Sequence, residues 1–287
     1  MYTRNCELKP GREFPPGMQR IALGIEYDGS DFHGFQIQQS ATHTIQQHLH
    51  AGLSSIADEE ITVVCAGRTD AGVHASEQVV HFDTLAVRPQ SAWSLGVNAR
   101  LPTGICVRWA HPVAPDFHAR FSAVSRRYRY LILNRPTRPA LFDRQLTWCK
   151  RPLDLTTMQA AATCLVGEHD FSAFRAAQCQ AKSAVRTIHH IYLSQWDDII
   201  AIDIQANAFL HHMVRNITGC LLAIGAGDKP VAWLSSILHS RDRTLAAATA
   251  PSCGLYLVKV EYPSLFGLPQ QALGPLLIPP SAQWQAV

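Results

Sequence analysis

The sequence has no apolar run as long as the roughly 18 residues that a membrane-spanning helix needs. Its N-terminus lacks the basic start and apolar core of a secretory signal peptide. No segment is of low complexity, and no sequence repeat is visible. Of its 287 residues, 47% are hydrophobic and only 16% are charged, which is enough apolar material for one large or two mid-sized domains. We therefore expect a soluble, cytoplasmic, globular protein.

Cysteines with the spacing of a metal site are also missing. The eight cysteines are scattered and none forms a Cys-x-x-Cys pair, so we expect reduced thiols rather than a disulfide framework or a zinc site. Fourteen histidines include the adjacent pairs His189-His190 and His211-His212. Neighbouring residues on a helix or strand point in different directions, so neither pair is expected to offer two ligands to one metal ion. The sequence predicts no bound metal.

The net charge is only +3, but charges of opposite sign are separated along the chain. Residues 20–85 carry two basic and nine acidic side chains, whereas residues 118–151 carry nine basic side chains and one acidic one. Eight of those nine are arginines, which bind phosphate groups through two hydrogen bonds at once. Such a block indicates a surface for a nucleic-acid backbone, with a solvated charged face as the alternative.

A polar stretch between two β-branched runs is the candidate functional site. Cys65-Ala66-Gly67-Arg68-Thr69-Asp70-Ala71-Gly72-Val73-His74 connects strands that we expect at 61–64 and 78–82. Its two glycines permit a close approach to a ligand, and the turn would present Asp70 and Arg68 at its tip. From these residues alone, a hairpin turn capped by Asp70 is an equal alternative.

The order of the predicted elements indicates an α+β protein. The first half is expected to contain strand 20–27, helix 44–57, strands 61–64 and 78–82, helix 89–98 and strand 104–110, which is the β-α-β-β-α-β order of a ferredoxin-like unit. The second half repeats this order loosely, with strand 124–133, helix 154–166, strands 185–193 and 199–206, helices 209–224 and 230–238, and strand 255–260. Residues 167–175 are expected to form a polar connection, and the chain after Pro263 a coil.

We therefore predict two ferredoxin-like α/β subdomains around a central mixed or antiparallel sheet. The N-terminal subdomain is expected at 20–114 and carries the loop with Asp70, and the C-terminal subdomain is expected at 115–265. A flexible leader, 1–19, precedes them, and a tail, 266–287, follows.

Four stretches taken together resemble the tRNA pseudouridine synthase A family. They are residues 67–74, residues 117–121 leading into 126–130, residues 207–216 and residues 249–257. The likeness extends over about 21–263. In one place the chain departs from the family pattern, since Gly-Trp-Gln after the first strand is here Gly34-Phe35-Gln36, which keeps an aromatic ring. The resemblance implies the pseudouridine synthase fold.

The same resemblance implies an isomerase that acts on tRNA. Members of this family convert uridine to pseudouridine at positions 38, 39 and 40 of the anticodon stem-loop, and they work as homodimers. The reaction moves the base from N1 to C5 attachment and consumes nothing, so we expect no cofactor and no metal. The target uridine must leave its stack, which costs a few kcal/mol.

Five residues match positions with known roles in the family. Asp70 matches the nucleophile, Arg215 the arginine that pairs with it, and Arg68 the residue that contacts the RNA and fills the space of the flipped base. Tyr128 matches the tyrosine that stacks on the uracil and is a candidate for assisting proton transfer at C5. Leu257 matches the apolar residue under the base, with ordinary core packing as an equal alternative.

Two more of these assignments have structural alternatives. Arg68 could form a plain salt bridge with a neighbouring acid, and Tyr128 could be a core tyrosine, a role that we expect for Tyr130 instead. Binding of tRNA is expected to depend on the basic block, in particular on Arg120, Arg126, Arg127 and Arg129.

Two other functions are compatible with the residues. A non-catalytic RNA-binding protein would keep the arginines and the aromatic residues but would not need Asp70 or Arg215. A metal-dependent phosphoesterase would use Asp70, His74 and the paired histidines, and would be sensitive to chelators.

Overall fold

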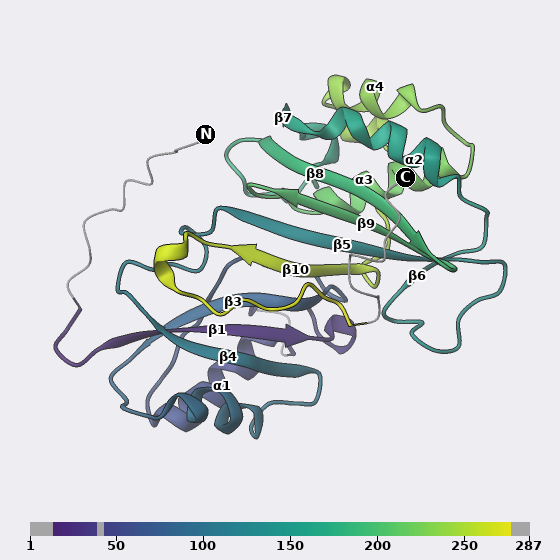
Figure 1. Cartoon of the computed structure of the whole chain (residues 1–287). Helices are drawn as coiled ribbons and strands as arrows, with labels where there is room; N and C mark the ends of the chain where they lie inside the picture. Colours follow the sequence, from purple (N-terminus) through teal and green to yellow (C-terminus); the bar gives the residue numbers. More distant parts are fainter. Residues whose placement is uncertain (1–13, 39–42, 277–287) are drawn as a thin grey trace.

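One mixed sheet of ten strands crosses the whole molecule in the computed structural model, which describes residues 14–38 and 43–276. Its main path has the order β4-β1-β3-β10-β5-β9-β8-β7, with β2 paired to β3 and β6 paired to β5. Helix α1 lies at the end formed by β4, β1 and β3, and helices α2, α3 and α4 lie at the other end (Figure 1). The expected α+β class is therefore confirmed.

The first half contains five of the elements. They are β1 (Gln19–Tyr27), α1 (Ile45–Ala57), β2 (Val64–Cys65), β3 (His74–Thr84) and β4 (Ile105–Val113). Strand β1 pairs antiparallel with β3 on one side and with β4 on the other. Helix α1 begins at the expected cap, because the side chain of Thr44 accepts a hydrogen bond from the backbone N–H of Gln47. Its buried stripe includes Ile45, Leu49 and Leu53, which have no exposed surface.

The second half contains the remaining main elements. They are β5 (Ser125–Asn134), β6 (Thr147–Cys149), α2 (Leu155–Ala162), β7 (Gly167–Asp170), β8 (Val185–Trp196), β9 (Ile199–Ala206), α3 (Met213–Gly225), α4 (Ala232–Ser240) and β10 (Leu255–Glu261). Strand β5 lies between β10 and β9 and is antiparallel to both. This arrangement mirrors the first half, where β1 lies between β4 and β3.

A short seam joins the two halves. Strand β10 pairs in parallel with β3, and only Tyr256 with His74 and Leu257 with Ala75 are in register. The ring of His74 also stacks on that of Tyr256, with 4.7 Å between the centroids. The sheet is continuous across this seam and therefore does not mark a boundary between two subdomains. The subdomain bounds at 114 and 115 stay predictions.

The helix predicted at 209–224 begins four residues later than expected, at Met213. Asn207 is held by β8, since its backbone N–H donates to Thr187 O and its side-chain Oδ1 accepts from the Thr187 N–H. His212 then adopts a left-handed backbone conformation, with φ of 61°. Phe209, the first apolar residue of the predicted stripe, therefore lies in a loop.

Several short elements also differ from the sequence expectation. The connection at 167–175 contains β7, an edge strand that depends on its pairing with β8, and β6 was not predicted. The helix expected at 89–98 is built around the π-helix η2 (Ala92–Gly96), and a 3₁₀ turn (Ser264–Phe266) interrupts the coil expected after Pro263. Most of the predicted leader and the end of the tail lie outside the described residues. Within the described part of the chain, no helix is long and apolar enough to cross a membrane.

Two helical glycines differ in the space around them, and this difference predicts opposite effects of alanine. A Cβ on Gly219 in α3 would lie 2.0 Å from the backbone oxygen of Ala248, whereas a Cβ on Gly52 in α1 would be 3.4 Å from its nearest neighbour, Leu101. We expect Gly219→Ala to lower the free energy of unfolding by about 1–3 kcal/mol through overpacking. Gly52→Ala, the matched control, should raise it by up to about 1 kcal/mol through helix propensity. Urea unfolding measures both, and equal effects would contradict the packing argument.

Glu77 on β3 predicts a pH-dependent cost to stability. Its side chain is only 6% exposed and its Oε2 has no hydrogen-bond partner among the described residues. Burial raises the pKa of Glu77 to about 7, although the positive charges of Lys259 and Arg108 oppose this shift. The folded protein therefore binds more protons than the unfolded chain between the ordinary pKa of 4.5 and 7. Stability contributed by this group falls as the pH rises through this window.

We expect the change in the free energy of unfolding caused by Glu77→Gln to be more stabilising at pH 8 than at pH 5. The difference should be at most about 3 kcal/mol, since one pKa unit corresponds to about 1.4 kcal/mol. Urea unfolding at both pH values measures it. Glu168→Gln, which changes an exposed carboxyl group, is the control and should show no such difference. An equal effect of Glu77→Gln at pH 5 and pH 8 would contradict the raised pKa.

Candidate active site

The loop between β2 and β3 carries Asp70 and ends at the seam between the two halves. It spans 66–73, because β3 begins at His74, four residues earlier than predicted. Gly72, with φ of 75°, occupies the left-handed region that favours glycine. The side chain of Ser252 lies so close that a Cβ on Gly72 would be 2.6 Å from its Oγ. A glycine at this position therefore lets the loop lie close to the segment before β10.

Gln78 on β3 holds the start of this loop. Its Nε2 donates to the carbonyl oxygen of Gly67 at 2.5 Å, and its Oε1 accepts from the N–H of the same residue at 3.4 Å. The side-chain amide of Gln78 thus binds both the N–H and the carbonyl oxygen of Gly67, as a residue of a neighbouring antiparallel strand does. Because Gln78 has no exposed surface, these bonds are made without competition from water.

Thr69, directly before Asp70, is held from the side of β1. Its hydroxyl lies 2.7 Å from the hydroxyl of Tyr27, and its carbonyl oxygen accepts from the Phe35 N–H at 3.0 Å. Gly34 lets this contact form, since a Cβ there would lie 2.8 Å from Thr69 O. Burial raises the pKa of Tyr27 well above its usual value, so its phenol stays protonated and available for the bond.

His74 at the end of the loop has structural partners. Its Nδ1 lies 3.1 Å from both the backbone N of Gly29 and Oδ1 of Asp28, and its Nε2 lies 3.1 Å from the carbonyl oxygen of Cys253. The side chain is only 2% exposed. His74 is therefore positioned to tie β3 to the segments around it rather than to share a site with Asp70.

Asp70 is paired with Arg215, as predicted from the resemblance. Nη1 of Arg215 donates to Oδ2 of Asp70 at 3.3 Å. The Asp70 side chain keeps 27% of its surface exposed, whereas that of Arg215 keeps 15%. The carboxylate thus faces solvent while its counter-ion lies behind it.

The guanidinium of Arg215 is fixed by the segment before β10. Its Nε donates to the carbonyl oxygen of Ala250 at 2.8 Å, and the Ala250 N–H donates back to Arg215 O at 3.2 Å. The same segment is held to α3 by Thr249, whose hydroxyl donates to Oδ1 of Asn216 at 2.7 Å. Arg215 therefore reaches Asp70 in a defined orientation.

Two further residues, which the sequence placed near Asp70 only in the phosphoesterase alternative, approach the same carboxylate. Nε2 of His211 lies 3.2 Å from Oδ1 of Asp70, and Nε2 of His212 lies 3.2 Å from Oδ2. The expectation that this adjacent pair would diverge is wrong, because His212 adopts the left-handed conformation just before α3. Within the described part of the chain, these three residues form a group that could hold a metal ion, with ligand atoms within 4.8 Å of one another.

His212 is electrostatically influenced by this group. Burial lowers its pKa below the usual value, the charge of Asp70 acts in the opposite direction, and Arg215 and His211 lower it further. The imidazole is therefore neutral near pH 7. The sequence shows that His211 and His212 precede an apolar helix. Only the backbone conformation of His212 shows that both imidazoles point toward Asp70.

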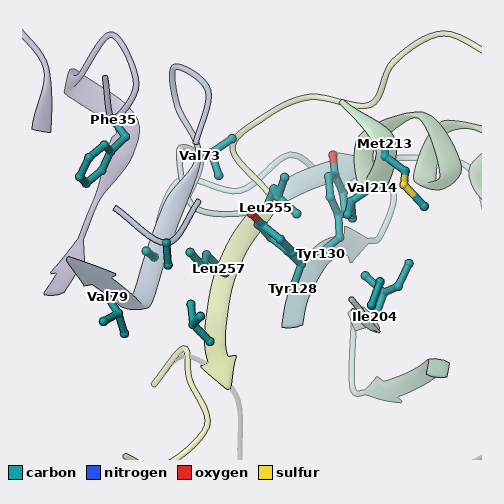
Figure 2. Packing of buried hydrophobic residues seen from close by; sticks show 14 of the residues in the cluster. Phe35, Val73, Val79, Tyr128, Tyr130, Ile204, Met213, Val214, Leu255 and Leu257 are labelled. Atoms are coloured by element: carbon teal, nitrogen blue, oxygen red, sulfur yellow. The ribbon is translucent and has the colours of Figure 1, made fainter. Parts of the chain in front are cut away.

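A cluster of buried aromatic and apolar side chains lies beside the loop that carries Asp70. Figure 2 shows Tyr128 and Tyr130 on β5 next to Leu255 and Leu257 on β10. A Cβ on Gly67 would be 3.8 Å from the hydroxyl of Tyr128, so this phenol reaches the loop that carries Asp70. Burial raises the pKa of Tyr128 well above its usual range, and the Asp70 charge adds to the shift.

The hydroxyl of Tyr130 has other partners. It lies 2.6 Å from Thr147 Oγ1 and donates to the carbonyl oxygen of Pro251 at 2.8 Å. Tyr130 and Leu257 have no exposed surface, whereas Tyr128 keeps 8%. Of the two tyrosines, Tyr128 is thus the one that remains partly accessible.

Arg68 projects from the loop into solvent. It is exposed, and it makes no ion pair or hydrogen bond with the part of the chain that the structure describes. The alternative of a plain salt bridge does not occur there. Arg68 is available to a ligand that approaches Asp70.

The four arginines expected to bind RNA lie in different surroundings. Arg120 is exposed, with its guanidinium 5.5 Å from the ring centre of Phe121, which is itself 71% exposed. Arg126 is half-buried and donates to the carbonyl oxygens of Ala66 and Arg120, at 3.0 and 2.6 Å. Arg126 thus connects the Asp70 loop to the segment that presents Arg120.

Arg127 and Arg129 are engaged with a carboxylate. Both donate to Asp203, at 2.6 Å from Nε of Arg127 and 2.7 Å from Nε of Arg129. Although burial raises the pKa of Asp203, the hydrogen bonds from His190 and the two arginines outweigh it and hold the pKa well below its usual value. Their expected role in RNA binding stays a prediction, and this placement favours a structural role.

Comparison with known proteins identifies the family. The family model described as tRNA pseudouridine synthase matches residues 24–122 and 161–263. The chain is 56% identical over 262 residues to tRNA pseudouridine synthase A of Alcanivorax borkumensis, covering 91% of this chain and 98% of the relative. It is 55% identical over 259 residues to the protein of that name from Pseudomonas aeruginosa, covering 90% and 91%.

Similarity to solved structures is weaker. One match is to a solved H/ACA RNP bound to a substrate RNA containing 2'-deoxyuridine, and it covers 70% of this chain and 44% of that chain. Its TM-score of 0.34 and identity of 10% are too low to support a conclusion about fold or function. The sequence matches cover nearly all of the two halves and the residues of the Asp70 site. The chain belongs to the tRNA pseudouridine synthase family, whose activity is a pseudouridine-forming isomerisation.

Proposed function

We propose that this protein isomerises uridine to pseudouridine at positions 38, 39 and 40 of the tRNA anticodon stem-loop, with Asp70 as the nucleophile. The observation that carries the proposal is the 3.3 Å pair between Arg215 and a partly exposed Asp70, on a loop braced by buried hydrogen bonds. A carboxylate attacks as a nucleophile in its ionised form, and the Arg215 guanidinium provides a fixed positive charge beside it.

The reaction needs no group beyond the chain and the RNA. The bond between N1 and C1′ breaks, the uracil rotates, and C5 bonds to C1′ while C5 loses a proton and N1 gains one, so product and substrate are isomers. Asp70 adds either to C1′ or to C6 of the base and leaves again at the end. Both routes use the same ionised carboxylate.

Tyr128 and Leu257 are proposed to receive the flipped uracil. The raised pKa of Tyr128 means that it enters the reaction as a neutral phenol, which favours stacking over the role of a base. Leu257 has no exposed surface in the free protein, so its contact with the base requires a small rearrangement or passes through Tyr128. Arg68, exposed on the same loop, is proposed to occupy the vacated place in the RNA.

The tRNA is proposed to bind across the exposed Arg120–Phe121 pair. An arginine beside an aromatic ring provides a phosphate contact and a stacking surface together. Arg126 would support this contact through its bonds to the loop. By its resemblance to the family, the protein is proposed to act in the cytoplasm as a homodimer.

Tritium release from tRNA that carries 5-tritiated uridine tests the reaction and the nucleophile. Formation of the C5–C1′ bond expels the tritium at C5, so the wild type should release it. Asp70→Asn, which keeps the shape of the side chain, should release none. A second transcript, with cytidine at positions 38, 39 and 40, should release none with the wild type.

Measurement of RNA affinity provides the control for these assays. Asp70→Asn should bind tRNA as tightly as the wild type, which separates chemistry from binding. Release by Asp70→Asn at the wild-type rate would exclude Asp70 as the nucleophile. Undiminished release from the cytidine-containing transcript would exclude the proposed positions.

Substitution of Arg215 tests the ion pair. Arg215→Ala removes the counter-ion of Asp70 and should lower kcat/KM for tritium release roughly 100-fold or more, while Arg215→Lys should keep part of the activity. Arg108→Ala, which breaks a partly exposed pair with Glu26 outside the basic block, is the control and should keep wild-type activity. Equal activity of all these proteins would remove Arg215 from the site.

A further inference from the structure

Three possible metal ligands converge on the exposed side of the candidate active site. The imidazole nitrogens of His211 and His212 each lie 3.2 Å from an oxygen of Asp70. In a tetrahedral site with bonds of about 2.0–2.1 Å, neighbouring ligand atoms lie about 3.3–3.4 Å apart. Each histidine lies near this distance from one of the two Asp70 oxygens, and the three ligand atoms lie within 4.8 Å of one another, which puts them within reach of one ion.

The convergence has a local cause in the backbone. Successive side chains of a helix or strand point in different directions, which separates the two imidazoles of a regular pair. Here His212 has φ of 61°, so the chain turns between the two residues before α3 begins at Met213. Their ring centres lie only 4.1 Å apart, on the same side as Asp70.

The ligand atoms are accessible from solvent. The exposed fractions of the side chains are 35% for His211, 28% for His212 and 27% for Asp70. A solvated ion could therefore enter and keep one or two water molecules as further ligands. Two imidazoles and one carboxylate select zinc and similar transition metals over magnesium or calcium, which prefer oxygen ligands.

Arg215 limits how tightly such an ion binds. Its guanidinium lies 3.3 Å from Oδ2 of Asp70 and is held by Ala250, so it cannot move away without losing that bond. A divalent ion must share the carboxylate with this positive charge. We therefore expect reversible occupation rather than a permanently bound metal.

We propose that Asp70, His211 and His212 form a reversible inhibitory site for Zn²⁺ and similar transition-metal ions. Coordination uses the lone pairs of the carboxylate that the nucleophile needs, and the ion occupies the space through which a uridine would approach. The inhibitory effect rests on the proposed role of Asp70. Binding of the ion itself does not depend on that role.

Binding is tested with Co²⁺ on the full chain without RNA, because Co²⁺ bound by imidazole has a visible absorption spectrum and is displaced by Zn²⁺. The wild type should show this spectrum. His211→Ala, His212→Ala and Asp70→Asn should each weaken Co²⁺ and Zn²⁺ binding about tenfold or more, which corresponds to about 1.4 kcal/mol. Circular dichroism confirms that each variant is folded, and Asp70→Asn changes only a partly exposed loop side chain.

The chain offers a matched control in a second pair of histidines. Nδ1 of His43 lies 3.1 Å from Nε2 of His48 on the exposed side of α1, with no part in the Asp70 group. His48→Ala should therefore leave both the Co²⁺ spectrum and the Zn²⁺ affinity unchanged. A spectrum lost in His48→Ala but kept in His211→Ala and His212→Ala would overturn the proposed site.

The functional consequence is measured separately by tritium release. Zn²⁺ should inhibit the wild type, EDTA should restore its activity, and higher tRNA concentration should weaken the inhibition. Unchanged release at a Zn²⁺ concentration that saturates the site would overturn the inhibitory role. If the wild type shows no release even without metal, the proposed reaction fails, while the Co²⁺ result still decides whether the site exists.

Discussion

The arrangement depends on a seam of two residue pairs between β3 and β10. His74 and Ala75 lie in register with Tyr256 and Leu257, and this short parallel contact joins two antiparallel halves into one sheet. The loop with Asp70 ends where the seam begins, and Leu257 lies on the other side of it. Residues far apart in the sequence thus meet at a place to which both halves contribute.

The pair between Asp70 and Arg215 crosses this seam. Its strength depends on two separate supports, one in each half: Gln78 holds the Asp70 loop to β3, and Ala250 holds the guanidinium of Arg215. Both supports are hydrogen bonds to backbone groups, which orient a side chain more closely than exposed charge pairs do.

Alternation along β5 divides the basic block into two environments. Arg126 and Tyr128 are separated by two positions and act near the Asp70 loop, whereas Arg127 and Arg129 both bind Asp203. Because successive side chains of a strand point to opposite faces, a run of arginines cannot form one continuous surface. Arg126 therefore supports the Asp70 loop, Arg127 and Arg129 form ion pairs with Asp203, and Arg120 is the exposed one of these four.

The sequence by itself determined the class of fold, most elements and the family, because periodic apolar residues, caps and four motifs are local features. Thr44 and the stripe that follows it predicted α1, and the motif around Asp70 predicted the ion pair with Arg215 through the resemblance alone. The start of α3 and strand β7 could not be predicted, since Asn207 is held by Thr187 and β7 exists only through its pairing with β8.

Only the tertiary structure decided where side chains of similar type point. The histidine pair converges on Asp70 because one residue, His212, takes a left-handed conformation that its sequence neighbours do not indicate. Tyr128 and Tyr130 have the same residue type and strand, yet Tyr130 is tied to Thr147 and Pro251 while Tyr128 reaches the loop. Local sequence sets the period of an element, but the tertiary contacts set which groups meet, because they join residues far apart in the chain, such as Asp70 and Arg215.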